Sequence, residues 1–194
     1  MSASPTLALS QSFGRARTLS RIMTVLFAIA FLVMLSTAVS APVMVIFPKS
    51  PGGADLGIGL GNGVGVNFGA LHGWPAINAM LTVELFCLPS VLMLYHILKL
   101  FFCFTRGEVF ANNPIAHIRA AGLWLTASFF TSIAAVFLLD LFGVNHGGRF
   151  HFPGALPAIV LWFSGKLFAG IATTIAAYVM AEARRIADEN ASIL

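Results

Sequence analysis

Four long apolar runs constrain this chain more than any other feature of its sequence. They cover Ile22–Phe47, Ile77–Phe104, Ile118–Gly143 and Ala155–Ala181. Each run reaches the roughly 20 residues that a helix needs to cross a hydrocarbon layer about 30 Å thick. Charged residues make up only 9% of the chain, against about 25% in a soluble domain. The runs therefore predict four transmembrane helices.

The polar gaps between the runs are too short to hold a second, soluble domain. We expect a single all-α membrane domain over residues 1–194, folded as a bundle of four transmembrane helices. The predicted helices cover residues 22–47, 77–104, 114–143 and 155–187. The first connection, residues 48–76, is expected to lie outside the cell and to contain a small β-hairpin at residues 57–68.

Basic residues predict how the chain is oriented. Eight of the 11 Lys and Arg residues flank the two chain ends and the middle connection: Arg15, Arg17, Arg21, Lys99, Arg106, Arg119, Arg184 and Arg185. The other two connections hold only Lys49 and Arg149. Because cytoplasmic loops are enriched in Lys and Arg, both termini and the middle connection are expected in the cytoplasm.

The first run also invites comparison with a secretory signal peptide. Val39-Ser40-Ala41 resembles a cleavage tripeptide, and basic residues precede the run. The apolar part, however, exceeds the 7–15 residues usual for such a signal, and Pro42 follows the candidate bond. We therefore expect an uncleaved membrane anchor.

The stretch "DLGIGLGNGVGVNFG", Asp55–Gly69, alternates glycine with apolar residues. A dinucleotide-binding loop requires G-x-G-x-x-G between a strand and a helix. Here the sixth position is Asn62 after Gly57-Ile58-Gly59, and Val64 after Gly59-Leu60-Gly61. The expected location outside the cell also separates this stretch from nucleotide pools. Phosphate binding is therefore not expected.

A β-hairpin is the better interpretation of this stretch, because Asn62-Gly63 suits a two-residue type I′ turn. The predicted register pairs Gly61 with Val64, Gly59 with Val66, Gly57 with Phe68, Leu60 with Gly65 and Ile58 with Asn67. An isolated two-stranded hairpin is marginal in water. This one must lean on the bundle, on the loop Arg149–Pro153 or on a partner, so a structural role and a docking role both remain open.

Three charged residues fall inside the apolar runs, where each costs roughly 2.5–3.5 kcal/mol at mid-helix. They are Glu84, Asp140 and Lys166, and all three belong to the outer half of the predicted bundle. We expect them to form one intramembrane polar cluster in which Glu84 and Lys166 pair. The cluster either fixes the helix register or serves as a relay or a polar ligand pocket.

A relay needs titratable groups across the full depth of the membrane. His96 is the candidate in the inner half of the second run, and it lies about 18 Å along the helix axis from Glu84 at 1.5 Å per residue. That distance disfavours transport. Cys87 and Cys103 lie about 24 Å apart on the same helix, so they cannot pair within the chain and are expected to be reduced packing residues.

Small residues recur at four-residue spacing in the last two runs. The fourth run contains Gly165, Ala169, Thr173 and Ala177, with Gly170 and Thr174 in an adjacent row, and the third contains Ala127, Thr131 and Ala135. Such rows allow close approach of two helix backbones in a membrane. They favour contacts within the bundle, with a homo-oligomer as the alternative. Lys166 flanks the row and is expected to point toward neighbouring helices.

The sequence predicts no catalytic, metal or cofactor site. His72, His146 and His151 lie in the outer connections without the short spacing that holds two metal ligands on one element; we expect scattered loop histidines, with a metal site as the alternative. No nucleophile–base–acid set is visible, so enzymatic activity is not expected. No stretch of the sequence interleaves basic and aromatic residues on a soluble surface, so nucleic-acid binding is not expected.

The segments expected in the cytoplasm contain residues that are typical of helix ends. Gly107 suits the end of the second helix, Asn112 or Asn113 suits a cap, and Pro114 suits the first turn of the next helix. Near the C-terminus, Glu182 with Arg185 and Arg184 with Asp188 are spaced for ion pairs along one helix.

These segments resemble the bacterial "domain of unknown function 2975" family of small four-helix inner-membrane proteins. The resemblance rests on Arg106-Gly107-Glu108-Val109-Phe110, on Asn113, Ile118-Arg119 and Gly122, and on Arg184-Arg185-Ile186 with Glu189-Asn190. It covers Lys99 to Leu194 in detail, although the family's closing motif carries an acidic pair where this chain has Glu189-Asn190. The resemblance implies importance for Arg106, Gly107, Glu108, Phe110, Arg119, Arg185 and Glu189, and a catalytic role for none of them.

Some members of that family are encoded beside a small helix-turn-helix regulator, which implies a signalling role. The charged set either staples three helix ends together or presents a recognition patch to a cytoplasmic protein. The leading hypothesis is a non-enzymatic inner-membrane protein that acts through protein contacts, as an accessory subunit or as a regulator's membrane partner. The alternative is a transporter or sensor built on Glu84, Asp140 and Lys166.

Overall fold

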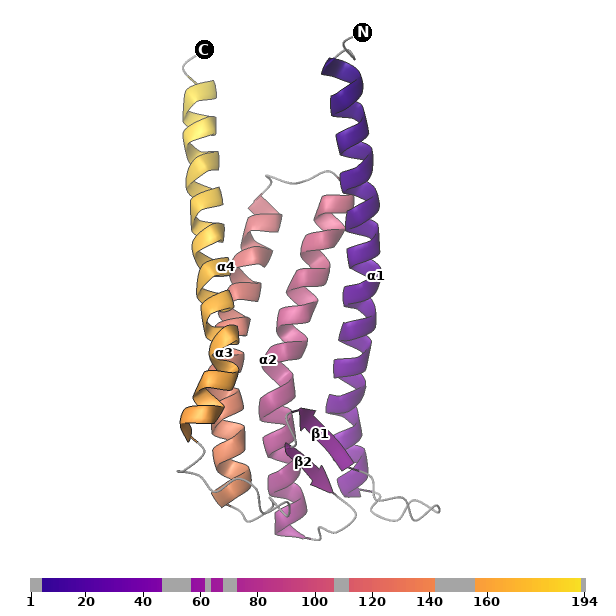
Figure 1. Cartoon of the computed structure of the whole chain (residues 1–194), viewed down its shortest axis with the longest axis vertical. Coiled ribbons are helices and arrows are strands. Elements are labelled where there is room, and N and C mark those ends of the chain that lie inside the picture. Colours follow the sequence, from indigo (N-terminus) through magenta and orange to yellow (C-terminus); the bar gives the residue numbers. More distant parts are fainter. Residues whose placement is uncertain are drawn as a thin grey trace.

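The described part of the computed structural model contains four long helices and one pair of short strands, arranged as in Figure 1. It describes residues 5–46, 57–61, 64–67, 73–106, 112–141 and 156–192. In chain order the elements are α1 (Pro5–Ile46), β1 (Gly57–Gly61), β2 (Val64–Asn67), α2 (Trp74–Thr105), α3 (Asn112–Leu141) and α4 (Leu156–Ala191).

All four helices are long and apolar enough to cross a membrane, as the sequence predicts. The qualifying segments are Thr18–Val43, Trp74–Thr105, Asn113–Leu138 and Phe163–Ala191. The segment in α1 is the most apolar, with a mean hydropathy of 2.5, and the segment in α4 is the least apolar, with 1.3. The apolar runs thus coincide with continuous helix in each case.

The helix ends differ most from the prediction at the two ends of the chain. α1 begins at Pro5 rather than at Ile22, and α4 continues to Ala191 rather than to residue 187. Apolar runs mark only the part of a helix that suits lipid. The flanking segments contain residues such as Ala, Leu, Arg and Glu, which favour helix in water as well, so the helices continue past the apolar segments.

The start of α2 is set by local chemistry. Gly73 precedes it with φ at 67°, a left-handed conformation that glycine adopts readily. Pro75 follows in the first turn, where its missing N–H is not needed. Trp74 is 76% exposed, as suits an aromatic side chain at a membrane interface. At the other end, Arg106 donates its backbone N–H to the carbonyl oxygen of Cys103 at 3.1 Å, while Gly107 lies outside the described residues.

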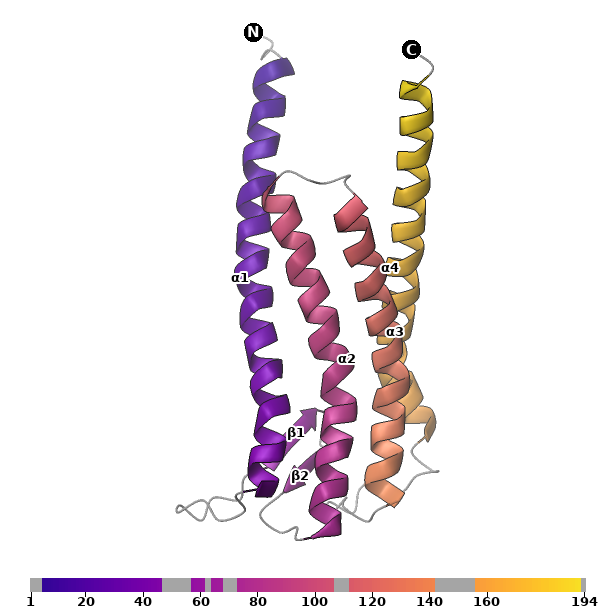
Figure 2. The same ribbon diagram turned by 180° about the vertical axis from the view of Figure 1, so that it is seen from behind.

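The helices are arranged as an open row. Within the described residues, extensive helix contacts join α1 to α2, α2 to α3 and α3 to α4. Figures 1 and 2 show α1 and α4 at opposite edges of the row. Both views also show both chain ends on one side, where α1 and α4 continue beyond α2 and α3. The predicted four-helix architecture is therefore open, with two inner and two edge helices.

The hydrophobic core lies along α2 and extends to its neighbours. Ala79, Val83 and Cys87 of α2 are almost fully buried. Small side chains dominate here because helices without a strong hydrophobic drive in lipid associate by close packing. Near the C-terminal end of α2, Phe101 stacks on Phe27, from the middle of α1, with ring centroids 5.3 Å apart. Both cysteines are free, as expected.

β1 and β2 pair antiparallel, in a register that differs from the predicted one. Gly61 pairs with Val64, as expected. The other pairs are Gly59 with Gly65, Ile58 with Val66 and Gly57 with Asn67, so the predicted pairs of Gly59 with Val66, Gly57 with Phe68, Leu60 with Gly65 and Ile58 with Asn67 are wrong.

The register shifts between Gly59 and Gly61 because one strand carries an extra residue there. Glycine-rich strands specify register weakly, since few side chains fix one face against a core. The predicted turn residues Asn62 and Gly63 lie outside the described residues, as do Phe68 and the loop Arg149–Pro153.

α3 and α4 approach each other along a row that the sequence identifies only in part. A Cβ added to Gly122 would lie 2.8 Å from the backbone nitrogen of Thr174, and one added to Gly170 would lie 2.7 Å from that of Thr126. The adjacent row of Gly170 and Thr174 is therefore the contact row.

The first half of the first predicted row does not make this contact, although the last member of that row, Ala177, is 1% exposed. A Cβ added to Gly165 would meet nothing within 4 Å, and Ala169 is exposed. On α3 the facing residues are Gly122 and Thr126 rather than Ala127 and Thr131. Residues at four-residue spacing drift around an α-helix of 3.6 residues per turn, so a row one position away is easily mistaken for the contact row.

Candidate functional site

Lys166 is the centre of the intramembrane site. Its ammonium donates a hydrogen bond to the hydroxyl of Ser132 on α3, with 3.0 Å between Nζ and Oγ. The same nitrogen lies 4.8 Å from the ring centroid of Phe86 on α2 and 4.9 Å from that of Phe163 on α4. The side chain thus reaches three helices, as expected from its position beside the small-residue rows.

The Ser132 hydroxyl links the ammonium to the backbone of α3. It accepts a hydrogen bond from Lys166 and donates one to the carbonyl oxygen of Ser128, 2.6 Å away. Ser132 is fully buried and Ser128 is 1% exposed. A buried polar group is costly unless it is hydrogen-bonded, and this chain of bonds satisfies both the hydroxyl and one donor of the ammonium.

Two aromatic rings supply the rest of the stabilisation. Phe86 and Phe163 meet edge to face, with centroids 6.4 Å apart. Their ring faces carry negative charge density, so a cation nearby is stabilised without a carboxylate, by about 2 kcal/mol or more where water is excluded. The surroundings of the Lys166 side-chain nitrogen are therefore two rings and a hydroxyl, rather than a carboxylate.

The predicted pairing of Glu84 with Lys166 is not what the structure contains. Within the described residues, all ion pairs lie on α4, between Arg184 and Asp188 and between Arg185 and two glutamates. Glu84 lies on α2 and is partly exposed. Ser132 and the two rings occupy the surroundings of the ammonium in its place. The side chain of Asp140 lies outside the described residues, so its membership of the polar cluster stays a prediction.

Two arginines near the connection between α2 and α3 rest on aromatic rings. Arg119 of α3 lies 5.0 Å above the ring of Tyr178 on α4, and Arg106 lies 5.6 Å from the ring of Phe102 on its own helix. Gly107, Glu108 and Phe110 lie outside the described residues. Of the predicted motif, the structure thus ties Arg119 across two helices, through a ring rather than through an ion pair.

The charged residues near the C-terminus pair along α4. The bonds of Arg185 to Glu182 and Glu189 are called the Arg185 clasp. Arg185 donates to Glu182 and to Glu189, each at 2.6 Å, and Arg184 pairs with Asp188 at 3.5 Å. The two predicted pairs are confirmed, and the bond from Arg185 to Glu189 adds a third.

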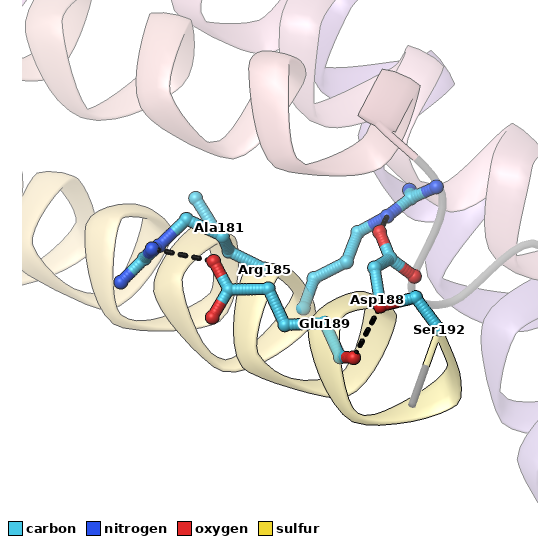
Figure 3. Close-up of a pocket in the computed structure, with 6 residues that line it drawn as sticks. Ala181, Arg185, Asp188, Glu189 and Ser192 are labelled. Carbon is cyan, nitrogen blue, oxygen red and sulfur yellow. Dashed lines mark hydrogen bonds and ion pairs between the residues drawn. The ribbon is translucent and has the colours of Figure 1, made fainter. Parts of the chain in front are cut away.

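Arg185, Asp188 and Glu189 line a surface hollow (Figure 3). The volume of this hollow is about 440 Å³. All the lining residues come from α4: Ala181, Arg184, Arg185, Asp188, Glu189 and Ser192. A hollow along a single helix is open to its surroundings, so it is not an enclosed ligand cavity.

Two histidines meet between α2 and α3. The Nδ1 atoms of His96 and His117 lie 3.2 Å apart, with ring centroids at 5.4 Å. Of these two histidines, only His96 was a candidate from sequence. The role of His117 could not be predicted from sequence, because it lies on a different helix and meets His96 only when α2 and α3 pack together. The described residues contain no group of three or more His, Cys, Asp or Glu side chains suited to a metal, and His72, His146 and His151 lie outside them.

The remaining residues of the Lys166 site were also missed from sequence. Ser128 and Ser132 are spaced i and i+4 on α3, one position beyond the row of Ala127 and Thr131 chosen as the contact row. A buried lysine needs an acceptor, so a serine pair at helical spacing on the neighbouring run was the available signal. Phe86 and Phe163 were hidden among the 18 phenylalanines of the chain.

Four helices of membrane-spanning length and composition place this chain among the multi-pass membrane proteins. Comparison with protein-family models, with curated proteins and with solved structures found no match. Membership of the "domain of unknown function 2975" family therefore stays a prediction that rests on the short motifs at the end of α2, the start of α3 and the end of α4.

Proposed function

We propose that this protein is a non-enzymatic integral membrane protein that acts through protein contacts. It would serve as an accessory subunit of a membrane complex or as the membrane partner of a regulator. We further propose that it lies in the inner membrane of a bacterium with both termini in the cytoplasm. The concentration of arginines in residues 15–21 and 184–185 supports this orientation.

The observation that carries the proposal is the last part of α4. From Ala181 to Ser192 every residue except Arg184 is exposed, and this α4 extension, residues 181–191, projects beyond α2 and α3 (Figures 1 and 2). This extension therefore presents its side chains to a partner protein. The Arg185 clasp holds it in helical form, and Ile186, 48% exposed, gives it an apolar contact point.

The open row supports the same proposal. α1 lies at an edge and packs mainly on α2 in the described part of the chain, which leaves most of its surface uncovered. A second membrane protein has direct access to α1 and to α4. The strand pair at the opposite end of the row is proposed to lie outside the cell and to offer a second contact surface.

Purification from the native membrane in mild detergent, followed by identification of co-purifying chains, tests the proposal. A defined partner protein is expected to co-purify with the wild-type chain. Arg185→Gln combined with Glu189→Gln is expected to lose it, while Lys99→Gln, a charge change on α2, keeps it. Recovery of the wild-type chain alone and monomeric would count against protein contacts as its role.

A transporter or sensor remains the second candidate, because Lys166 places a cation where three helices meet. Its ammonium contacts a hydroxyl and two rings, so an anionic group on a ligand has a ready counter-ion. Under this alternative Lys166→Met abolishes uptake or ligand response. Under the leading proposal the same variant still captures its partner.

A further inference from the structure

The contact between His96 and His117 is suited to more than helix packing. Two ring nitrogens 3.2 Å apart require one N–H donor and one lone pair, so at least one of the imidazoles is neutral. Neutral imidazole is the form that binds metal ions. We propose that His96 and His117 together bind a divalent transition-metal ion of the Zn²⁺ class, which takes the place of the proton between them.

The separation of the two nitrogens matches that role. Zinc–nitrogen bonds of about 2.0–2.1 Å in tetrahedral geometry place two ligand nitrogens about 3.3–3.4 Å apart. The observed distance is 3.2 Å, and the rings are tilted by 42° to each other. Rotation of each ring about its Cβ–Cγ bond, a soft torsion for histidine, directs both lone pairs at one point without moving a helix.

Rigid elements hold both ligands. His96 lies within α2 and His117 near the start of α3, and these two helices pack against each other along much of their length. The ring of Tyr95 meets that of His96 edge to face, with centroids 5.3 Å apart. Ligands carried on packed helices are more precisely placed than ligands on loops.

The surroundings predict a moderate affinity. The described residues offer no third His, Cys, Asp or Glu, so water completes the coordination. Lys99 lies over the ring of Tyr95 at 5.6 Å and, three residues after His96 on α2, belongs to the same side of that helix. Its positive charge opposes a dication, so Lys99 provides a control of opposite sign to the two histidines.

The experiment measures Zn²⁺ binding to the full chain in detergent, purified without a polyhistidine tag and stripped with a chelator. The background carries His72→Asn, His146→Asn and His151→Asn, so that only His96 and His117 remain. A competing chromophoric chelator reports affinity, and the visible absorption of bound Co²⁺ reports nitrogen coordination. We expect one ion per chain, an affinity at least about tenfold lower in His96→Asn and in His117→Asn, and a higher affinity in Lys99→Gln.

Two results would overturn the proposal. The first is a background protein that is folded by circular dichroism yet takes up no Zn²⁺ or Co²⁺. The second is uptake that survives both histidine substitutions. Each histidine is also replaced by Gln, so that loss of folding in one variant leaves another to read.

Discussion

Gly122 of α3 and Gly170 of α4 face each other across the closest approach of two helices. A Cβ on Gly122 would lie 2.9 Å from the carbonyl oxygen of Gly170, and a Cβ on Gly170 would lie 2.9 Å from that of Gly122. Each glycine is followed four residues later by a threonine whose hydroxyl donates to that glycine's carbonyl, at 3.0 Å for Thr126 and 2.8 Å for Thr174. The two helices thus use the same four-residue device in a reciprocal contact.

Replacing either glycine by alanine is expected to push α3 and α4 apart. The obstacle is backbone on both sides, which cannot move aside, so Gly122→Ala and Gly170→Ala are each expected to cost about 1–3 kcal/mol of stability, the range for overpacking. Unfolding in mixed micelles with increasing SDS measures this change. Gly165→Ala is the matched control, because its Cβ meets nothing within 4 Å; equal losses in all three variants would contradict the packing account.

The hydroxyl of Ser132 is expected to stabilise the fold mainly through its hydrogen bond with Lys166. Ser132→Ala removes the acceptor of the ammonium at 3.0 Å, and a hydrogen bond to a charged group is worth about 1.5–3 kcal/mol. Lys166→Met removes the charge and keeps the volume, so adding Ser132→Ala to it should cost much less. A double-mutant cycle on the unfolding free energy gives the coupling; additive losses would show that the two side chains act independently.

The contact of Arg119 with Tyr178 predicts a smaller effect. The guanidinium lies 5.0 Å from the ring centroid, and exposed contacts of this kind contribute about 0.5–1 kcal/mol. Tyr178→Phe keeps the ring and is expected to retain the stability of α3 on α4, whereas Tyr178→Leu loses it. Thermal denaturation in detergent distinguishes the two variants, and a loss in Tyr178→Phe as large as in Tyr178→Leu would assign the effect to the phenol hydroxyl.

Both chain ends are expected on the cytoplasmic side of the membrane. Four crossings return the chain to its starting side, and Figures 1 and 2 place both ends at the same end of the row. Reporter fusions that are active only in the cytoplasm should therefore signal at both the N-terminus and the C-terminus, and a fusion within residues 48–56 should not. Signals on opposite sides for the two ends would require an odd number of crossings.

The membrane-length helices could be predicted from sequence because hydropathy acts over twenty residues and needs no knowledge of neighbours. The ion pairs on α4 could be predicted for a related reason, since residues three and four apart on a helix must meet. Both features depend on one helix at a time.

Features that depend on two helices were predicted poorly. Lys166 was expected to pair with Glu84, yet Ser132 and two phenylalanine rings surround it. The row of Gly170 and Thr174 was placed second to that of Gly165 and Ala169. In each case, which side chains meet depends on how one helix is rotated about its axis relative to its neighbour. A shift of one residue along the sequence is enough to exchange one row for the next. His117 shows the same limit, because only packing brings it to His96.

The order of packing has a consequence for how this protein is made. Each helix rests mainly on the one synthesised just before it, so every new helix meets its docking surface as it enters the lipid. Assembly then proceeds in pairs, with no need to wait for the last helix to close a ring against the first. A chain of this design can acquire its native contacts during synthesis, one hairpin after another.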